Sequence, residues 1–280
     1  MTSAAAANAP ARPVTVRRVV VGLVLALFGI ASVFNPWTFY AVVLIVGLIS
    51  LYELSHLCDI KGQPLEYPVA MLGVLCYIAL AVLQLSHRWE GVLLAGIVLA
   101  AFWLGMHGEQ KGYFARTAYT LLAVLYIGKL LTYFVFIRQA PNVGLYWTLY
   151  VVVLVALTDI FAMLVGSLIG RHQLTVLSPK KTIEGSVGAI AIVTLTAVAL
   201  GLTPYLHLLW WQGALIGAGT CVAAQAGDLV ESALKRDAGV KDTGTVIQGH
   251  GGVLDRFDSY LFGGVAFFAL VHVLGLIAFE

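Results

Sequence analysis

The sequence predicts an all-α polytopic membrane protein, and three observations support this fold class. Of its 280 residues, 60% are hydrophobic and only 11% are charged, whereas a soluble domain carries roughly 25% charged residues. The mean hydropathy is +0.94. Continuous apolar stretches of about twenty residues recur along nearly the whole chain, which is the pattern of membrane helices. Strands of a membrane β-barrel would alternate apolar and polar side chains instead.

We expect about nine transmembrane helices after a short tail that is rich in Ala and Pro. The candidate spans are 19–34, 37–57, 68–86, 91–106, 117–137, 146–170, 186–203, 206–226 and 260–278. The fourth span is short and contains Gly96, which weakens a helix. No internal repeat and no inverted two-half symmetry is visible, so the pattern does not favour a secondary transporter.

The distribution of Lys and Arg predicts the orientation, because cytoplasmic loops carry an excess of both. With the N-terminus in the cytosol, 13 of the 16 basic residues lie on the cytosolic side. Arg88 and Arg138 then lie outside, and Lys129 lies within the fifth span. The odd number of spans places the C-terminus outside. The net charge of +2 is too small to indicate nucleic-acid binding.

Two groups of acids flank the turn between the last two spans. Asp228, Glu231, Ser232 and Lys235 have the spacing i, i+3, i+4, i+7, so they share one helix face if the eighth span continues. Asp255, Asp258 and Ser259 repeat the i, i+3, i+4 spacing. Because both spans meet the same side of the membrane, Asp228 and Asp255 can converge there. Hard carboxylate oxygens of this kind suit Mg²⁺.

Basic residues and glycines complete this segment. Lys235, Arg236, Lys241 and Arg256 surround the acids, and His250-Gly251-Gly252 precedes a helix start, where the backbone can approach an anion closely. Mg²⁺ commonly completes its shell with substrate phosphates. The segment therefore predicts a site for a nucleoside triphosphate and a metal, whereas a salt-bridged surface loop is the plainer alternative.

A second polar motif, Ser178-Pro179-Lys180-Lys181-Thr182-Ile-Glu184-Gly185, forms a predicted loop before a helix start. Ser178 or Thr182 can cap that helix, and Lys180 and Lys181 can bind a triphosphate or a lipid phosphate. The alternative is a topology signal that contacts anionic headgroups.

Acids and bases inside the apolar spans are candidates for function, because they are costly in a bilayer. Asp159 lies roughly 16 Å deep in the sixth span, at 1.5 Å per residue. Glu53 and His56 could pair across one turn of helix, and Lys129 could pair with an acid; we interpret these three as structural ion pairs. Three widely separated cysteines, Cys58, Cys76 and Cys221, form no disulfide framework.

The stretch from Ser232 to Asp258 resembles the signature of the phosphatidate cytidylyltransferases at every polar position: Ser232-Ala-Leu-Lys235-Arg236-x4-Lys241-Asp242-x7-His250-Gly251-Gly252-x2-Asp255-Arg256-x-Asp258. The preceding Gly227-Asp228-Leu-x-Glu231 and the SPKKT-x-EG motif resemble the same family. Asp159 is usually followed in this family by Ala and Tyr, but here Met163 occupies the Tyr position. That departure questions any role for a Tyr hydroxyl and raises the possibility of a divergent paralogue.

The resemblance implies a Mg²⁺-dependent enzyme that transfers the cytidylyl group of CTP to phosphatidic acid, giving CDP-diacylglycerol and pyrophosphate. It implies two cation positions held by Asp228 and Asp255, one of which need not hold Mg²⁺, with Asp159, Glu231 and Asp258 as further metal candidates. The implied catalytic set is Asp228, Lys235, Arg236, Lys241, Asp242, Asp255 and Arg256. The implied substrate-binding set is Ser178, Lys180, Lys181, Thr182, Glu184, Ser232, His250, Gly251 and Gly252.

We therefore expect three parts in the chain. Residues 1–15 form a disordered tail, 16–140 a transmembrane scaffold, and 141–280 the catalytic transmembrane region with a cytosol-facing site. The resemblance also implies a homodimer, and the short chain fits a bacterial inner membrane. The alternatives are a CTP-dependent enzyme with an isoprenoid acceptor lipid, or a transporter. A CDP-alcohol phosphotransferase is excluded because its DGxxARx8Gx3Dx3D pattern is missing.

Overall fold

The computed structural model describes residues 24, 27–107, 112–244 and 251–277, and these residues are mostly helical. The helices are α2 (Pro36–Ile60), α3 (Tyr67–Val82), α4 (Ser86–His107), α5 (Tyr113–Ala123), the π-helical turn η1 (Val124–Lys129), α6 (Leu130–Gln139), α7 (Gly144–Ile169), α8 (Ile183–Gly201), α9 (Trp210–Asp237) and α10 (Leu254–Val273). Two short strands, β1 (Gln173–Thr175) and β2 (Ser178–Thr182), join α7 to α8. The all-α membrane fold class is therefore confirmed.

Six helical segments in the described part of the chain are long and apolar enough to cross a membrane. They are α2, α4, the continuous segment from α5 through η1 to α6, α7, α8 and α9, whereas α3 is shorter. The predicted total of nine is thus approximate. Each predicted span from the second to the ninth coincides with a helical segment. In the first span, residues 24 and 27–33 are helical, whereas residues 19–23, 25 and 26 and the whole tail lie outside the described residues.

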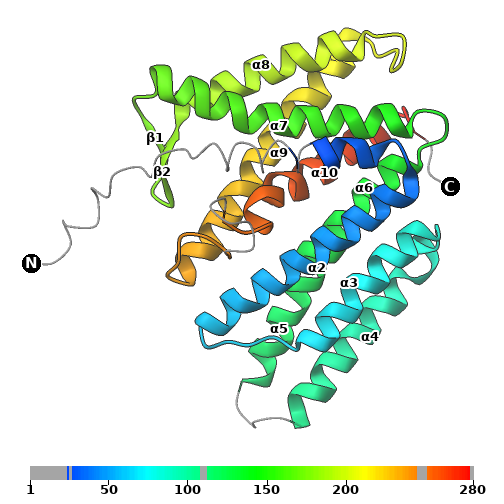
Figure 1. The fold of residues 1–280 in the computed structure, drawn as a ribbon, viewed down its shortest axis with the longest axis vertical. Helices are drawn as coiled ribbons and strands as arrows, with labels where there is room; N and C mark the ends of the chain where they lie inside the picture. Colours follow the sequence, from blue (N-terminus) through cyan, green and yellow to red (C-terminus); the bar gives the residue numbers. More distant parts are fainter. Residues whose placement is uncertain (1–23, 25–26, 108–111, 245–250, 278–280) are drawn as a thin grey trace, which may run out of the picture.

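The helices form two groups that meet at the C-terminal pair. In Figure 1, α2 to α5 form an elongated bundle, and α7 and α8 run side by side at a steep angle to it. α9 packs against α8 on one side and α10 on the other, and α10 also contacts α6 and α2. α9 and α10 therefore lie where the two groups of helices come together.

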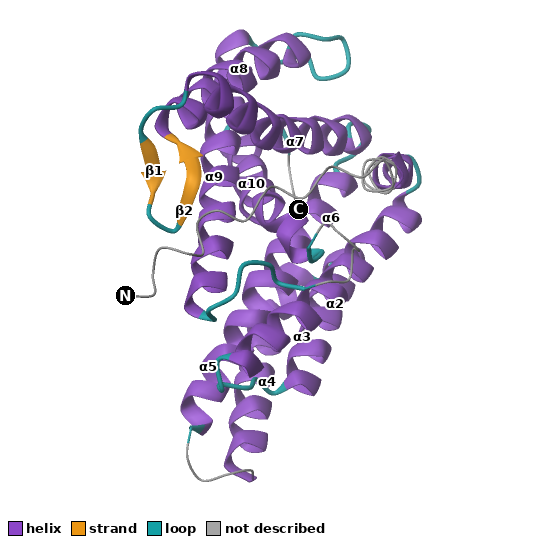
Figure 2. Ribbon diagram, turned by 60° about the vertical axis from the view of Figure 1, so that its left-hand side comes forward, coloured by secondary structure: helices purple, strands orange, loops and turns teal. Residues whose placement is uncertain are grey.

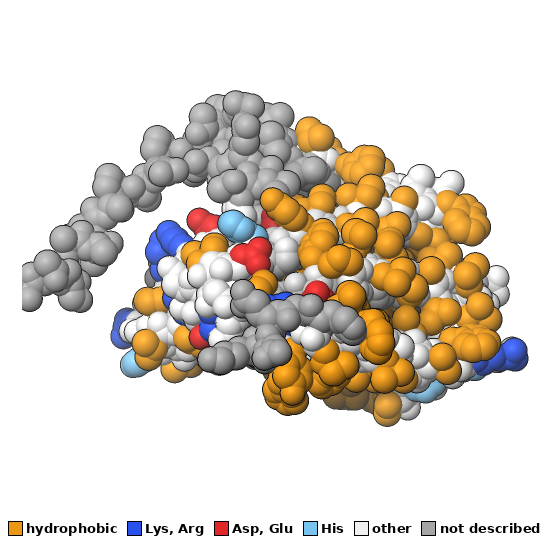
Figure 3. Space-filling model, turned by 90° about the horizontal axis from the view of Figure 1, so that it is seen from below, with side chains coloured by type: hydrophobic (Ala, Val, Ile, Leu, Met, Phe, Trp, Pro, Cys, Tyr) orange, Lys and Arg blue, Asp and Glu red, His pale blue; other side chains and the backbone are white. Residues whose placement is uncertain are grey.

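The surface matches a lipid environment. Apolar side chains cover most of the visible described surface in Figure 3, while many acidic and basic side chains gather at one side. On α7, for example, Met163 is 72% exposed and Leu168 is 73% exposed. Large apolar patches of this extent mark a surface that water does not cover. The three cysteines are free, as predicted.

The segment between α7 and α8 differs from the predicted loop. It forms an antiparallel hairpin in which Gln173 pairs with Thr182 and Thr175 pairs with Ser178 (Figure 2). Pro179 is tolerated because a strand in a two-stranded hairpin has one edge that needs no ladder bond. Thr182 caps α8 by accepting a hydrogen bond from Gly185 N at 3.1 Å, whereas Ser178 lies at the far end of β2 and does not cap it.

Candidate active site

The close approach of α9 and α10 forms the centre of the site. A Cβ atom at Gly227, on α9, would lie 2.5 Å from the carbonyl oxygen of Asp258, on α10. A side chain at this position would force the helices apart, and small residues commonly permit such contacts between membrane helices. The residue after Gly227 is Asp228. Glycine at 227 therefore brings the acids of the two helices together.

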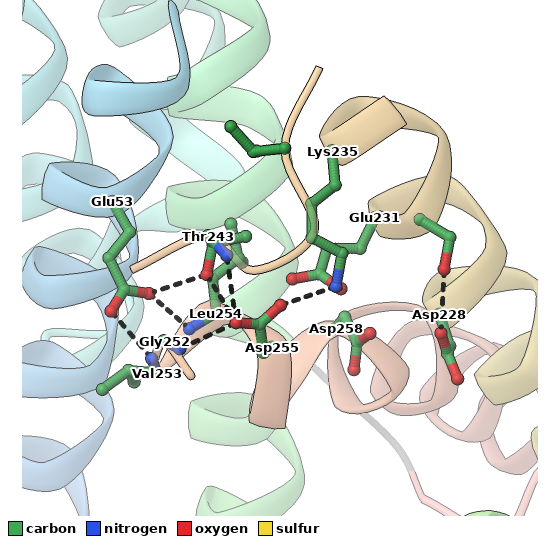
Figure 4. Close-up of polar contacts among 12 residues, drawn as sticks. Glu53, Asp228, Glu231, Lys235, Thr243, Gly252, Val253, Leu254, Asp255 and Asp258 are labelled. Carbon is green, nitrogen blue, oxygen red and sulfur yellow. Dashed lines mark hydrogen bonds and ion pairs between the residues drawn. The ribbon is translucent and has the colours of Figure 1, made fainter. Parts of the chain in front are cut away.

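Three carboxylates meet at this contact: Asp228 and Glu231 of α9 and Asp258 of α10, here called the acidic triad (Figure 4). One oxygen from each lies within 4.8 Å of the other two. Glu231 is fully buried and Asp258 is 5% exposed. Carboxylates this close repel one another unless a proton or a cation lies among them.

The acidic triad fits a divalent cation of the Mg²⁺ kind. Glu231 Oε1 is buried and has no hydrogen-bond partner among the described residues. An orphaned buried carboxylate oxygen is costly, and a bound cation would satisfy it. Hard oxygen donors of this kind are those that Mg²⁺ prefers.

Two lysines supply positive charge beside the triad. Lys181 Nζ of β2 lies 2.5 Å from Asp228 Oδ2. Lys235 Nζ lies 2.5 Å from Glu231 Oε2 and 2.6 Å from Asp255 Oδ1. The i, i+4 contact of Lys235 with Glu231 confirms that these α9 residues share one face, as does a 3.3 Å hydrogen bond from Ser232 Oγ to Asp228.

Asp255 lines the same cavity as Asp228, as the spacing predicted, but its hydrogen-bond partners differ from those of the triad. Its Oδ2 accepts hydrogen bonds from Gly252 N at 2.7 Å, Thr243 N at 3.1 Å and Thr243 Oγ1 at 3.0 Å. The structure thus groups Asp228 with Glu231 and Asp258, while Asp255 joins the site through Lys235.

The triad lies in a cavity of about 330 Å³ between the hairpin, α7, α8, α9 and α10. Ten of the predicted site residues line it: Asp159, Lys180, Lys181, Thr182, Asp228, Glu231, Lys235, Asp255, Arg256 and Asp258. The cavity therefore combines acids that can hold a cation with bases that can hold phosphate groups.

One side of the cavity is formed by α7. Asp159 is exposed there and accepts a 3.1 Å hydrogen bond from Ser259 Oγ of α10. Ala162 and Met163 also line this side, together with Leu174 of the hairpin. Met163, which stands where the related family usually has Tyr, thus faces the site. An apolar wall beside charged groups suits a substrate with an apolar and an anionic part.

The other predicted residues do not line this cavity. Arg236 donates to Leu177 O at 3.4 Å and to Val240 O at 3.2 Å, so it joins the hairpin to the end of α9. Glu184 accepts bonds from the backbone N–H groups of Arg171 and His172 at the base of the hairpin. The remaining described positions are Ser178, Ser232, Lys241, Asp242, Gly251 and Gly252, and His250 lies outside the described residues.

The charged groups inside the scaffold helices divide into two cases. Lys129 pairs with Glu90 at 2.6 Å, which confirms the expected ion pair. The suggested pair of Glu53 with His56 is wrong, because His56 is exposed while Glu53 is buried and binds two backbone N–H groups of a distant segment. Two N–H groups that start a helix satisfy a buried carboxylate better than a side chain that faces outward.

Sequence reasoning missed two polar residues of the cavity, Ser186 of α8 and Gln225 of α9. The Ser186 hydroxyl donates to the side-chain carbonyl of Gln225. Gln225 precedes Asp228 by one helical turn, so its i, i+3 spacing to a predicted site residue was an available signal. Ser186 has no such signal, because its partner is 39 residues away.

Comparison with known proteins identifies the family of this chain. A profile described as the cytidylyltransferase family matches residues 15–274, nearly the whole chain. The chain belongs to the cytidylyltransferase family. It is therefore an enzyme of the nucleotidyltransferase class and an integral membrane protein, and the transporter alternative is set aside.

Several curated bacterial relatives are similar over most of their length. The chain is 35% identical to the phosphatidate cytidylyltransferase of Staphylococcus epidermidis over 223 residues, which cover 78% of this chain and 84% of that protein. It is 33% identical to the phosphatidate cytidylyltransferase of Bacillus subtilis over 260 residues, covering 88% and 93%. The corresponding enzyme of Staphylococcus aureus is 33% identical over 228 residues, covering 78% and 84%.

Proposed function

We propose that this cytidylyltransferase transfers the cytidylyl group of CTP to phosphatidate, giving CDP-diacylglycerol and pyrophosphate, in a Mg²⁺-dependent reaction. The observation that carries the proposal is the acidic triad with Lys181 and Lys235 beside it, in a cavity that has an apolar wall. The printed names of the relatives support the choice of phosphatidate as acceptor.

The reaction needs little general-base catalysis, because the phosphate of phosphatidate is already ionised. One of its oxygens attacks the α-phosphorus of CTP, a new P–O bond forms, and the bond from the α-phosphorus to the β-phosphate oxygen breaks. Pyrophosphate carries away the electron pair of that bond. The protein therefore has to position two anionic substrates and offset their repulsion.

Asp228, Glu231 and Asp258 would hold the Mg²⁺ in this proposal. Asp159 is a further candidate, and the predicted ligand role of Asp255, which lines the same cavity, stays a prediction. When bound, the cation neutralises charge on the nucleotide phosphates and on the leaving pyrophosphate. Lys180, Lys181, Lys235 and Arg256 line the cavity and would bind the remaining phosphate oxygens. Roles for Arg236, Lys241 and Asp242 stay predictions from the family signature.

The apolar wall would receive the acceptor lipid. Ala162, Met163 and Leu174 line the cavity next to Lys181, so a phosphate near the lysine places glycerol-linked acyl chains against apolar side chains. Neighbouring α7 residues such as Leu164 and Leu168 are exposed and would face the bilayer. A lipid can then enter sideways from the membrane while CTP enters from water.

The expected division of the chain is part of this proposal. Every residue that lines the cavity lies between 159 and 258, which supports a catalytic region within 141–280 and a scaffold within 16–140. We also propose a homodimer in a bacterial inner membrane, with the N-terminus in the cytosol and the C-terminus outside. Reporter fusions at the C-terminus test the orientation, and the mass of the detergent-solubilised protein tests the dimer.

An acceptor panel tests the proposed function. The purified protein is mixed with Mg²⁺, CTP labelled at the α-phosphate, and either phosphatidate, an isoprenoid alcohol phosphate or an isoprenoid glycerol phosphate. We expect label in the lipid phase with phosphatidate, together with release of pyrophosphate. Transfer to an isoprenoid lipid alone would keep the cytidylyltransferase chemistry and overturn the acceptor.

A further inference from the structure

The carboxylate of Glu53, on the scaffold helix α2, binds backbone N–H groups at the start of helix α10, about 200 residues later in the sequence. Glu53 Oε1 accepts a hydrogen bond from Val253 N, and Glu53 Oε2 accepts one from Leu254 N, both at 2.8 Å (Figure 4). Glu53 is 1% exposed. It lies roughly 10 Å from the C-terminal end of α2, at 1.5 Å per residue. Burying an ionisable group at that depth costs free energy unless its hydrogen-bond partners offset the cost.

The side chain of the N-cap residue of helix α10 does not satisfy the N–H groups at the start of this helix. Its N-cap residue is Val253, whose side chain accepts no hydrogen bond. The first N–H groups of a helix need acceptors and carry partial positive charge, so a carboxylate is the favoured partner. Glu53 satisfies two of these groups at once. Charge-assisted bonds to backbone N–H groups are stronger than bonds between neutral partners.

The backbone is fitted closely around this carboxylate. A Cβ atom at Gly252 would lie 2.1 Å from Thr243 Oγ1 and 2.5 Å from Glu53 Oε2. A Cβ atom at Gly244 would lie 2.9 Å from Glu53 Oε1. Glycine is needed at 252 because any larger residue would displace the carboxylate or the hydroxyl. The contacts with Glu53 and Thr243 thus give a structural reason for glycine at position 252.

A chain of contacts runs from Glu53 to the acidic triad. Thr243 Oγ1 lies 3.3 Å from Glu53 Oε2 and 3.0 Å from Asp255 Oδ2. Asp255 in turn binds Lys235, and Lys235 binds Glu231 of the triad. The Thr243 hydroxyl has one proton, so it can donate to only one of the two carboxylates at a time.

We propose that Glu53 is a positioning residue of the active site, which fixes the first turn of α10 and, through Thr243 and Asp255, the ammonium group of Lys235. The inference rests on the proposed function only for the choice of substrate. It makes the scaffold part of the chain, within 16–140, a contributor to catalysis. Glu53 does not line the cavity, so its effect is transmitted by the first turn of α10.

The test compares Glu53→Gln with Glu66→Gln. Glutamine keeps the shape of Glu53 but presents an NH₂ group to one of the two N–H donors, which then lacks an acceptor. Glu66 is a matched scaffold control, because it pairs with Arg116 at 3.3 Å and lies outside the cavity lining. Hydrogen–deuterium exchange of peptides covering residues 251–258 and calorimetric binding of CTP with Mg²⁺ are measured for each protein.

We expect Glu53→Gln to speed amide exchange in residues 251–258 and to weaken CTP binding, each by about ten- to a hundredfold, while Glu66→Gln changes neither. Thr243→Ser keeps the hydroxyl, so both measurements should match those of the unaltered protein. Thr243→Val removes the hydroxyl and should weaken CTP binding without changing amide exchange in residues 251–258. Unchanged exchange and binding in Glu53→Gln would overturn the proposal. A general loss of thermal stability with unchanged CTP affinity would also overturn it, since it would mark Glu53 as a packing residue.

The proposal and the assigned reaction can fail separately. Exchange at residues 251–258 and CTP binding need no acceptor lipid, so they report on Glu53 even if phosphatidate receives no label. Conversely, transfer to phosphatidate with no effect of Glu53→Gln would leave the proposed function intact and remove the positioning role.

Discussion

Lys181 of the β1–β2 hairpin and Asp228 of α9 form an ion pair, with Nζ and Oδ2 2.5 Å apart. Their side chains are 25% and 28% exposed, so the pair is only partly buried in the cavity lining. The hairpin is thereby tied to the helix that carries two members of the acidic triad. A cation at the triad would compete with Lys181 for Asp228 and leave the ammonium group available to phosphate.

Substitution of Lys181 should therefore affect nucleotide use more than folding. We expect Lys181→Met to raise the half-saturating CTP concentration by at least about tenfold, the usual effect of losing a charge-assisted bond. Lys181→Arg should retain more affinity because it keeps the charge. Steady-state rates over a range of CTP concentrations measure both. Equal CTP dependence in Lys181→Met and the unaltered protein would contradict this account of the hairpin.

Glu231→Gln tests the acidic triad as a metal site. Because the orphaned Glu231 Oε1 is a proposed ligand atom, we expect the Mg²⁺ concentration for half-maximal rate to rise by about ten- to a hundredfold, as for groups that support a metal. Removal of Mg²⁺ with a chelator should stop the unaltered enzyme. Glu90→Gln is the matched control, since Glu90 pairs with Lys129 in the scaffold. An equal Mg²⁺ requirement in Glu231→Gln and Glu90→Gln would count against the triad.

Lys235→Met should destabilise the fold as well as the reaction. Lys235 is 14% exposed, and its partners Glu231 and Asp255 are 1% and 9% exposed at their side chains. Removing one partner from a buried ion pair costs about 3–5 kcal/mol, because the remaining charges stay buried. Thermal unfolding in detergent measures the loss. If Lys235→Met had the same melting temperature as Lys181→Met, the prediction would be contradicted, because water would then have to reach the carboxylates of Glu231 and Asp255.

The helices could be predicted because the signal for them is local. Continuous apolar runs define membrane helices without reference to the rest of the fold, and the i, i+4 contacts of Lys235 with Glu231 and Ser232 with Asp228 follow from helix geometry alone. The sequence also placed Asp159 inside the membrane as a site candidate, and the structure puts it in the cavity lining.

What could not be predicted depends on contacts between distant segments. Glu53 was interpreted as a partner of His56, one turn away, because nothing in the sequence links it to Val253. The grouping of Asp228 with Asp258 depends on how closely Gly227 lets α9 approach α10. The hairpin was expected as a loop because a Pro in a short polar segment is typical of loops as well as of edge strands.

Met163→Tyr tests the one departure from the family pattern. Met163 is 72% exposed and lines the cavity, so a larger ring can be accommodated without displacing the core. We expect a change in the free energy of unfolding within the range of surface substitutions, about 0.5 kcal/mol or less, and a change in the half-saturating concentration of acceptor lipid. The CTP dependence should stay the same. A large loss of stability would show that the wall of the cavity is tightly packed at this position.

The most direct test of the central claim is a label-transfer experiment with Asp258→Asn beside the unaltered enzyme. Phosphatidate and Mg²⁺ are supplied with CTP labelled at either the α- or the γ-phosphate. We predict that lipid gains label only from α-labelled CTP, and that Asp258→Asn lowers this rate by at least about a hundredfold, as loss of a group that holds a catalytic metal would. Label from the γ-phosphate would identify phosphoryl transfer instead. A fully active Asp258→Asn enzyme would contradict the triad as the catalytic metal site.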